Sequence, residues 1–592
     1  MSTSPLSVLF PATAGMDMRI DTATYTPSQA GRFVQWTKNM RIHKGAWRTR
    51  YPIHEVPLDA PDSFHERDWQ GALIYHPRQG QGVHYLGVGR DRIIGCYGGR
   101  LFEIQTAGKV ADLTGAGFET GATKVPVQME QAENYVVKTD GTSLTLIYDG
   151  KTGVSFSRGF NRTFPDASSV PNNAGAIRYL ANRLWVSAYG RRLFAGDVLH
   201  RLEPEEAIDV LRFREQAFDA TSQWFAAEAT QGDTVALSMM KMGGREYAVM
   251  HGDNMGMTGV VLGVPRSEWP NQPMTLAISN ETAAAGPYAF AEGDWRLLFR
   301  SRRGIEETRL VLAEDNAVGG TAINMGRQVA PILEADIEEY LIFATLVNPP
   351  RWERTLCTVS PIIQNHRAFH RGILSMNRNP GDAIEAGQWA WEGVWTFPAA
   401  IGSVQQILEG RIDARQRVFM LMSKPEGNGL AEMTQVEGLD TLADGTKIRQ
   451  NGAIRTHKLT TRSEYLDTEF GEAAFLIRDI ESDIDLQLWL RDSENTEWRL
   501  QKEFSICRED ACGGCCGTVD RSELRVPIGR LSEISEGARW AQFHLETWGV
   551  ATWDFVLQPG ESSSLPQVDD SSNLSVRDCF SDHLGIFTFN ER

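Results

Sequence analysis

Residues 177–199 read IRYLANRLWVSAYGRRLFAGDVL, and this stretch decides the fold. An apolar strand pattern leads to a turn at Asn182, and a second apolar strand that carries Trp185 follows. Apolar residues that alternate with polar ones at a period of two are typical of half-buried β-strands, and Asn and Gly are typical of the turns between them. The stretch therefore predicts a β-hairpin.

The same pattern recurs along the chain, at residues 84–104, 134–153, 245–264 and 402–424. Hairpins repeated at irregular intervals of roughly 40–50 residues are typical of degenerate propeller blades. Such blades need neighbours to bury their faces, so the recurrence predicts one closed ring. We expect a mainly β protein with an irregular β-propeller of about six blades. Unrelated hairpins in two sandwiches are the alternative.

The chain has 592 residues, more than the roughly 250–300 residues that one hydrophobic core holds. Between the hairpins at 245–264 and 402–424 lies a stretch of different composition that prolines border. Near the C-terminus, Leu486, Leu488 and Leu490 alternate with polar residues as in a sandwich strand. The expected parts are an N-terminal strand segment that joins the propeller (1–60), propeller blades (61–265), an inserted β-domain (266–350), further blades (351–445), and a C-terminal β-sandwich with a flexible tail (446–592).

The net charge of −17 arises from 59 Lys and Arg against 76 Asp and Glu. It argues against a protein that binds nucleic acid by neutralising phosphates. An acidic wall that DNA slides past is compatible with it. No apolar run reaches the roughly 18–20 residues that span a bilayer. The N-terminus lacks the pattern of a secretory signal, so we expect folding in a cytosol.

Catalytic signatures are missing from the sequence: it has no GxSxG elbow, no phosphate-binding loop of the form GxxxxGK[ST], no HExxH and no EF-hand loop. Acidic pairs such as Glu205-Glu206, Glu306-Glu307 and Glu338-Glu339 are better interpreted as solvated surface than as glycosidase carboxylates. We therefore expect a protein that is not an enzyme.

Four cysteines fall close together, at Cys507, Cys512, Cys515 and Cys516. The spacing C-x4-C-x2-C begins the plant-type iron–sulfur pattern, for which Cys579 could supply the fourth ligand. A tetrahedral zinc site completed by Cys516 or Cys579 is another interpretation. Free thiols, or disulfides formed after an extracellular particle is released, are favoured over both metals. We therefore expect no cofactor, with zinc as the next alternative.

The N-terminal stretch 14–50 resembles the opening of the β-propeller tail nozzle, or tail tubular, proteins of short-tailed bacteriophages. The matching elements are Gly15, Ala30-Gly31, Asn39-Met40-Arg41 and Gly45-Ala46-Trp47-Arg48-Thr49-Arg50. Residues 181–199 resemble a blade of that family, although Ala195-Gly196-Asp197 stands where Phe/Tyr-Ser-Asp is commoner. Residues from about 454 to 557 resemble its terminal sandwich. The residues singled out by the resemblance are structural: Gly45, Trp47, Arg50, Asn182 and Trp185.

The resemblance implies a ring-forming protein of the virion tail, assembled in the bacterial cytoplasm. It implies a homohexamer below the head-to-tail adaptor ring that contacts other tail proteins, such as fibres or a needle, and has no membrane span. Such a ring retains the packaged double-stranded DNA and conducts it during ejection, and acidic residues are expected to line its lumen. A carbohydrate-binding or receptor-binding propeller, as an adhesin or glycosidase, is the alternative from another class. A cellular scaffold propeller would carry cleaner repeats.

Overall fold

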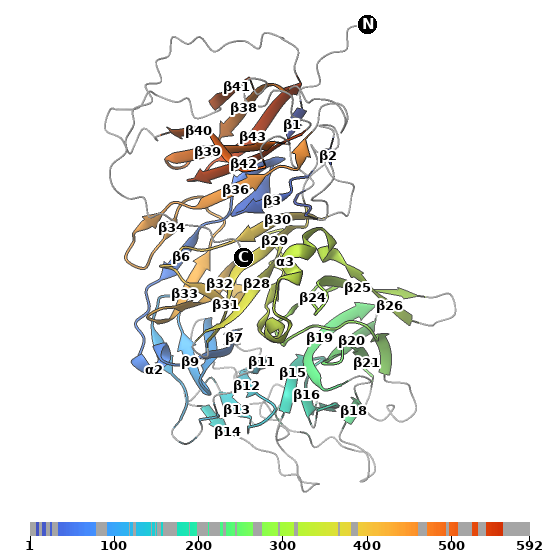
Figure 1. Cartoon of the computed structure of the whole chain (residues 1–592). Coiled ribbons are helices and arrows are strands. Elements are labelled where there is room, and N and C mark those ends of the chain that lie inside the picture. Colours follow the sequence, from blue (N-terminus) through green and yellow to red (C-terminus); the bar gives the residue numbers. More distant parts are fainter. Residues whose placement is uncertain are drawn as a thin grey trace.

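The protein is mainly β, as the sequence predicts, and its helices are short (Figure 1). Those among the described residues are α2 (Asp62–His65), η3 (Met325–Val329), α3 (Ala330–Glu334) and η4 (Glu338–Phe343). Among the described residues, no helix is long and apolar enough to cross a lipid bilayer. The computed structural model describes residues 8–10, 15–18, 24–25, 33–77, 91–115, 117, 119–121, 126–143, 145–148, 150, 155–157, 174–188, 190–197, 211, 213, 225–228, 232–242, 245–264, 275–293, 296–312, 318–364, 367–379, 389–459, 470–492, 496–506, 524–530 and 540–559.

Five sheets have the same construction: four antiparallel strands, each paired with the next one along the chain. The first sheet contains β7 (Trp69–Tyr75), β8 (Arg92–Tyr97), β9 (Arg100–Ile104) and β10 (Val110–Asp112), and the second contains β11 (Gln128–Ala132), β12 (Tyr135–Thr139), β13 (Leu146–Tyr148) and β14 (Ser155–Ser157). The third contains β15 (Ala174–Leu180), β16 (Arg183–Ala188), β17 (Arg192–Ala195) and β18 (Phe225–Glu228), and the fourth contains β19 (Thr234–Met242), β20 (Arg245–Gly252), β21 (Met257–Val261) and β22 (Thr275–Ser279). The fifth contains β23 (Phe290–Glu292), β24 (Leu297–Arg300), β25 (Ile305–Leu312) and β26 (Val318–Asn324). The hairpin quoted first is β15–β16, with Leu180 opposite Arg183.

Two further runs of four strands lie within a long, continuous sheet. The first is β27 (Leu346–Val347), β28 (Arg354–Gln364), β29 (Arg367–Asn377) and β30 (Ala390–Trp395). The second is β31 (Ser403–Ile412), β32 (Arg415–Lys424) and β33 (Gly427–Met433), completed by β6 (Ile53–Val56) from the other end of the chain. A strand from near the N-terminus thus finishes a sheet whose other strands come from residues 403–433.

The first strands of these runs form a cycle of contacts, although none of the sheets is closed on itself. The order of contact is β7, β11, β15, β19, β23, β27 and β31, and β31 contacts β7 in turn. Between successive sheets lie separate apolar clusters, which include Ile94 with Val136, Val137 with Leu184, Trp185 with Leu237, and Val249 with Phe299. Each of these sheets therefore buries apolar residues against a neighbouring sheet. We call this part the sheet ring.

The stretch 266–350, expected as an inserted domain, contributes to the sheet ring instead of standing apart. Strand β22 belongs to the sheet that β19 begins, so the expected boundary at residue 265 falls inside that sheet. Strands β23–β26 repeat the order of the other sheets, and β27 pairs with β28 across the boundary at 350. Pro349 and Pro350 lie in the connection between β27 and β28, because proline marks turns as readily as domain borders. The prolines at 265–273 lie outside the described residues.

Two more sheets form the other part of the molecule, which Figure 1 shows above the sheet ring. One contains β1 (Val8–Phe10), β4 (Met40–His43), β5 (Ala46–Thr49), β43 (Thr552–Pro559), β38 (Phe470–Arg478) and β41 (Leu524–Arg530). The other is the end of the long sheet, with β2 (Thr24–Tyr25), β3 (Trp36–Lys38), β34 (Asp440–Thr441), β35 (Lys447–Ile448), β36 (Asn451–Arg455), β37 (Lys458–Leu459), β39 (Ile484–Asp492), β40 (Arg499–Ile506) and β42 (Ala541–Trp548). We call them the terminal sheets.

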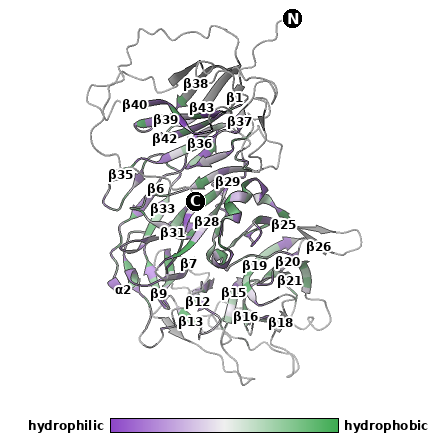
Figure 2. Cartoon of the chain, viewed as in Figure 1, coloured by the Kyte–Doolittle hydropathy of each residue, from purple (hydrophilic) through white to green (hydrophobic). Residues whose placement is uncertain are grey.

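The terminal sheets share one core, to which each contributes one face. Leu486, Leu488 and Leu490 are buried while the residues between them are only half-buried, which confirms the alternation predicted for this strand. They belong to the same apolar cluster as Trp47 and Trp553 of the opposite sheet. Hydrophobic residues are spread through both the sheet ring and the terminal sheets in Figure 2 and are not gathered in one part.

The N-terminal strands divide between the two parts, whereas the sequence placed residues 1–60 with the propeller. Strand β3 pairs with β36 (Trp36 opposite Arg455), and β5 pairs with β43 (Trp47 opposite Trp553). Strand β6 pairs with β33 of the sheet ring. Strand β3 also pairs in parallel with β30, through Lys38 and Val394. A single sheet thus runs from the ring into the terminal sheets.

Gly393 makes this passage possible, and its replacement gives a first prediction. Its φ is +92°, and a Cβ there would lie 2.0 Å from the Oγ1 atom of Thr37 in β3. Gly445 has a similar φ of +86° but open space around its Cβ position. We expect Gly393→Ala to lower the free energy of unfolding by about 1–3 kcal/mol more than Gly445→Ala, because only the first adds overpacking to backbone strain. Equal losses in urea unfolding would contradict this.

Candidate functional site

The residues that the sequence singles out as structural fall into two groups. Gly45, with φ +76°, makes the turn between β4 and β5, and Trp47 is buried in the core of the terminal sheets. Asn182, with φ +59°, makes the β15–β16 turn, and the indole of Trp185 donates to the carbonyl of Leu180 at 3.1 Å. The fifth residue, Arg50, lies where the chain leaves the terminal sheets for β6. A network of buried polar contacts lies around it.

Arg50 and Asp440 form a buried, bidentate ion pair at the junction between the terminal sheets and the sheet ring. The guanidinium contacts the two carboxylate oxygens at 3.0 and 2.5 Å, and the side chains are 1% and 0% exposed. Asp440 also accepts from the backbone N–H of Ile53 at 3.0 Å and from the amide of Gln450 at 3.1 Å. Planar guanidinium and carboxylate groups fit each other in this way with high geometric specificity. The pair therefore fixes the start of β6 against the segment that follows β33.

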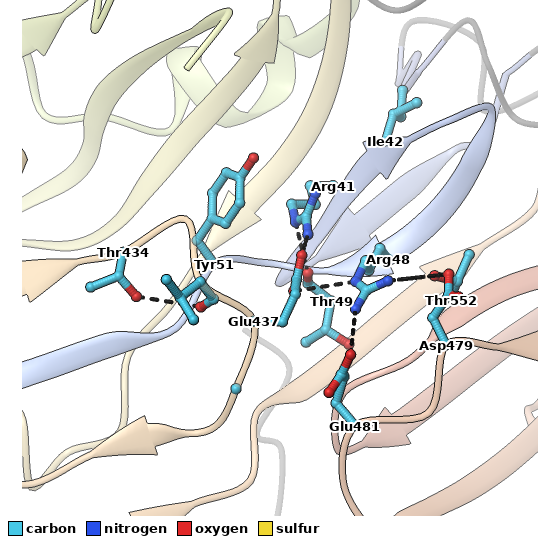
Figure 3. A network of polar contacts seen from close by, with 12 residues as sticks. Arg41, Ile42, Arg48, Thr49, Tyr51, Thr434, Glu437, Asp479, Glu481 and Thr552 are labelled. Carbon is cyan, nitrogen blue, oxygen red and sulfur yellow. Dashed lines mark hydrogen bonds and ion pairs between the residues drawn. The ribbon is translucent and has the colours of Figure 1, made fainter. Parts of the chain in front are cut away.

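Beside this pair, Arg41 and Arg48 both point to Glu437, as Figure 3 shows. Arg48 lies 3.2 Å from Glu437 and also contacts Asp479 at 3.3 Å and Glu481 at 3.6 Å. Burial lowers the pKa of Arg41, against the opposing effect of Tyr51 and Glu437. The strands β4 and β5 thus present two guanidinium groups to one carboxylate from the sheet-ring side of the chain.

A third ion pair holds β4 to the outer strand of a ring sheet. Arg354 of β28 contacts the carboxylate of Glu392 at 2.8 and 2.9 Å and donates to the carbonyl of Ile42 at 2.8 Å. Glu392 accepts from the N–H of Ile42 at 2.8 Å. It is the extra residue of a β-bulge in β30, since Ser375 pairs with Gly393 and Met376 with Trp391. Bulges re-aim side chains in this way. Burial opposes the charge of Arg354, and Glu392 outweighs it and raises the pKa of the arginine.

A separate charged cluster lies among the first strands of the sheet ring. Arg178 of β15 contacts Glu130 of β11 at 3.1 Å and Glu292 of β23 at 2.8 Å. The two carboxylates also accept from the backbone of Tyr179 and of Met239. Burial raises the pKa of Glu130, and Arg178 opposes that shift. One guanidinium thereby joins strands from separate sheets, and every charge in the cluster has a partner.

Uncharged side chains cross between first strands elsewhere in the ring. The hydroxyl of Tyr288 donates to the carbonyl of Val127 at 2.8 Å, and a Cβ at Gly71 would lie 2.4 Å from it. The amide of Gln406 accepts from the indole of Trp69 at 3.2 Å and donates to Ala72 at 3.0 Å. These contacts tie strands of different sheets together and place the side chains of Tyr288, Trp69 and Gln406 between them.

Ser238 and His251 are hydrogen-bonded to each other, with 2.8 Å between Oγ of the serine and Nε2 of the histidine. The Nδ1 atom accepts from the backbone N–H of Ala284 at 3.0 Å, so the proton of the neutral ring is on Nε2. Burial lowers the pKa of His251 to about 3. A general base needs an unprotonated Nε2 facing the serine. This pair has the opposite tautomer and is buried on both sides, so it holds strands together and cannot activate the hydroxyl.

Glu409 on β31 is a buried carboxylate with incomplete hydrogen bonding. One oxygen accepts from the N–H of Asn348 at 3.4 Å, and the other has no partner among the described residues. Burial raises the pKa of Glu409 to about 7, although Asn348 and Arg378 oppose the shift. The carboxyl is therefore protonated in the folded protein at pH values where it is ionised in the unfolded chain.

This shift gives a second prediction, on pH dependence. Between about pH 4.5 and 7 the folded state binds a proton at Glu409 that the unfolded state has lost, so stability falls as pH rises and levels off above 7. We expect Glu409→Gln to remove about 2–3 kcal/mol of this decline. Urea unfolding of wild type, of Glu409→Gln and of the exposed-site control Glu334→Gln at pH 5 and 8 measures it. Parallel pH profiles for the first two would contradict the assignment.

The cysteine cluster Cys507, Cys512, Cys515 and Cys516 lies outside the described residues, as does Cys579. In the part of the chain that the structure describes, no group of three or more His, Cys, Asp and Glu side chains is placed to bind a metal ion. Cys96 and Cys357 are buried free thiols, and burial raises their pKa to about 11 and about 12. Thiols in that state are poor nucleophiles and poor metal ligands.

Sequence reasoning found one side of the junction and missed the other. Arg41, Arg48 and Arg50 lie in the stretch that the sequence singled out, and their spacing places three cations within ten residues. Their partners Glu437 and Asp440 carry no local signal, because each is a single acidic residue about 390–400 positions away. Only the fold brings the two sides together.

No protein-family model matches this chain, and no curated protein matches it. Among solved structures, a chain from the crystal structure of BBS1N in complex with ARL6DN aligns at 9% identity and a TM-score of 0.34, over 65% of this chain and 98% of that one. The computationally designed Ika8 protein aligns at 10% identity and a TM-score of 0.32, over 65% of this chain and 100% of its own. At these TM-scores neither alignment carries an argument about fold or function.

Proposed function

We propose that the sheet ring is a seven-bladed β-propeller and that the terminal sheets are a β-sandwich fixed to it. Support for the propeller comes from the cycle of contacts among β7, β11, β15, β19, β23, β27 and β31, and from the apolar clusters between successive sheets. Strand β6 closes the last blade, which is how a propeller joins its two ends. The proposed propeller has one blade more than the roughly six expected, because the sheet β23–β26 is counted as a blade.

We propose that this protein is a structural component of a bacteriophage tail, a nozzle that extends the DNA channel below the head-to-tail adaptor and conducts the genome. The observation that carries the proposal is the junction itself. A continuous sheet, the pairs Arg50–Asp440 and Arg41–Glu437, and the backbone bonds of Ile42 to Arg354 and Glu392 join propeller to sandwich. A nozzle must keep its shape while DNA passes under pressure, and such a joint resists bending. The resemblance of residues 14–50 to the nozzle family points to the same class.

The DNA path in this proposal lies between copies of the chain. Tyr288, Gln406 and the Arg178 cluster occupy the space among the first strands, so no duplex of about 20 Å passes through one ring. A channel therefore needs several copies around an axis, as a homohexamer provides. Some of the acidic excess that gives the net charge of −17 would face that channel, where it repels phosphates and prevents trapping.

Native mass spectrometry and electron cryomicroscopy of the purified full chain, alone and with an adaptor ring, test the proposal. We expect closed rings, with six copies as the favoured number, and a lumen whose surface is acidic. A particle that stays monomeric in both conditions would refute the nozzle. A neutral or basic lumen would refute the acidic-wall part alone, and hydrolysis of a surface polysaccharide would favour the carbohydrate-active alternative.

A further inference from the structure

One of the terminal sheets carries a row of large side chains that crosses its neighbouring strands. In the register of the sheet, Trp36 of β3 lies opposite Arg455 of β36, and Arg455 lies opposite His544 of β42. His544 lies opposite Trp489 of β39, which in turn lies opposite Leu500 of β40. Directly opposite residues project from the same face of a sheet, so these side chains form one row. We call it the outer row.

The outer row lies on the face of the sheet that is turned away from the shared core. On either side of Trp489, Leu488 and Leu490 belong to the buried apolar cluster, whereas Trp489 itself is half-buried. Successive side chains of a strand point to opposite faces, so the row and the core leucines are on different sides. At one end, Trp36 is half-buried and packs in part against the apolar cluster. At the other end, Leu500 is 44% exposed.

Arginine side chains lie over the tryptophan rings of this face. The guanidinium of Arg455 is 5.5 Å from the ring centre of Trp36 and 5.1 Å from that of Trp498, the residue before β40. The guanidinium of Arg491 is 4.8 Å from the ring centre of Trp498, and its Nε atom donates to Gln542 at 2.6 Å. Such contacts hold long side chains in place, so a partner that binds them loses less conformational entropy.

The composition of this face is typical of the centre of a protein–protein interface. Tryptophan and arginine are enriched among the residues that dominate the binding energy of such interfaces. Trp36, Trp489 and Trp498 are all half-buried. By contrast, tryptophans that serve only as core residues are almost fully enclosed, and these include Trp185, Trp391, Trp395 and Trp553, each at most 2% exposed. The outer face therefore keeps aromatic surface available for contact.

Charge indicates which partner fits this face. Arg455 and Arg491 place positive charge beside the aromatic rings. The chain as a whole has 76 acidic against 59 basic residues, so another copy of it offers a predominantly acidic surface. Complementary charge favours that association and fixes its orientation. Nucleic acid has the opposite preference, because the acidic remainder of the surface repels phosphates.

We propose that the outer row, together with Arg491 and Trp498, is the surface on which a second copy of this chain docks. The contact is heterologous, since the basic and aromatic face of one copy meets an acidic surface of the next, and such contacts close rings. The inference rests on the proposed assembly into a ring and names the surface that makes it.

Mass photometry of the full chain over a concentration series tests this surface with the variant Leu500→Glu. The change places a carboxylate at the exposed end of the row, where it faces the acidic surface of the next copy. We expect the concentration at half-assembly to rise roughly ten- to thirty-fold. Ile323→Glu is the matched control, because Ile323 is 41% exposed and lies on β26 of the sheet ring. It should leave assembly unchanged, and equal losses in both variants would overturn the assignment.

Hydroxyl-radical footprinting of the wild type gives a readout that needs no variant, and it decides the matter if Leu500→Glu does not fold. Oxidation of Trp498 and Leu500 should be several-fold slower in the ring than in chains diluted to the monomer. Rings with equal oxidation in both states, or a Leu500→Glu protein that assembles normally, would overturn this surface and leave the nozzle standing. Protection that appears only with the adaptor ring would also overturn it, in favour of that partner. Wild type that stays monomeric in both conditions refutes the nozzle, and this inference with it.

Discussion

Asp440→Ala should lower the free energy of unfolding by about 3–5 kcal/mol, the largest effect we expect from one substitution. The change leaves the guanidinium of Arg50 charged and buried at 1% exposure, with carbonyl groups as its remaining partners. It also removes the acceptor of the Ile53 N–H, at the first residue of β6. Ring closure by β6 and attachment of the terminal sheets should weaken together, and urea unfolding monitored by tryptophan fluorescence would measure the loss.

A double substitution separates the loss of a partner from the loss of the pair. Arg50→Met with Asp440→Leu removes both charges and keeps apolar volume, so most of the lost stability should return. Asp444→Ala, four residues further along the chain, is the control at an exposed carboxylate and should have little effect. If Asp440→Ala were as stable as this control, the pair would not hold the junction.

Arg178→Met should lower the free energy of unfolding by about 2–4 kcal/mol. This loss is smaller than for a fully buried arginine, because the Arg178 side chain retains 29% exposure. The substitution leaves Glu130 and Glu292 facing each other without the cation that both contact. Like charges raise the pKa of carboxyl groups, so the variant should bind protons more readily when folded. The deficit should therefore be largest at neutral pH and shrink as the pH falls towards 5.

The rescue and the control for Arg178→Met use neighbouring residues. Adding Glu130→Gln removes one of the two facing charges and should restore part of the stability at pH 7. Lys241→Met removes a cation from an exposed pair with Glu246 and should have little effect. A deficit in Arg178→Met that is the same at pH 5 and pH 7 would show that packing, and not charge, is what the arginine supplies.

The sequence was sufficient for the β class and for individual hairpins, because these depend on local alternation. The turn at Asn182 and the alternation of Leu486, Leu488 and Leu490 are where the pattern predicts them. The expected boundaries of the inserted domain, at 265 and 350, fall inside sheets, since β22 pairs with β21 and β27 with β28. Proline and a change of texture indicate connections, and they do not reveal which strands meet in space.

The junction was beyond sequence reasoning for a physical reason. A buried ion pair depends on two residues that meet only in the fold, and Arg50 is separated from Asp440 by 390 positions. The placement of β3–β5 with the C-terminal strands was missed for the same reason, because a short strand carries no sign of its partner. The nozzle remains a proposal that rests on resemblance and on the character of this joint.

Because β6 pairs with β33, the polypeptide cannot complete its ring during the early part of its own synthesis. At about 5–20 residues per second, the ribosome needs on the order of 20–75 s between residue 56 and residue 433. Throughout that time β4, β5 and β6 emerge without the strands that cover Ile42, Trp47 and Ile53 in the finished protein. The order of translation thus delays the folding of the N-terminal strands until the C-terminal strands that pair with them have been synthesised.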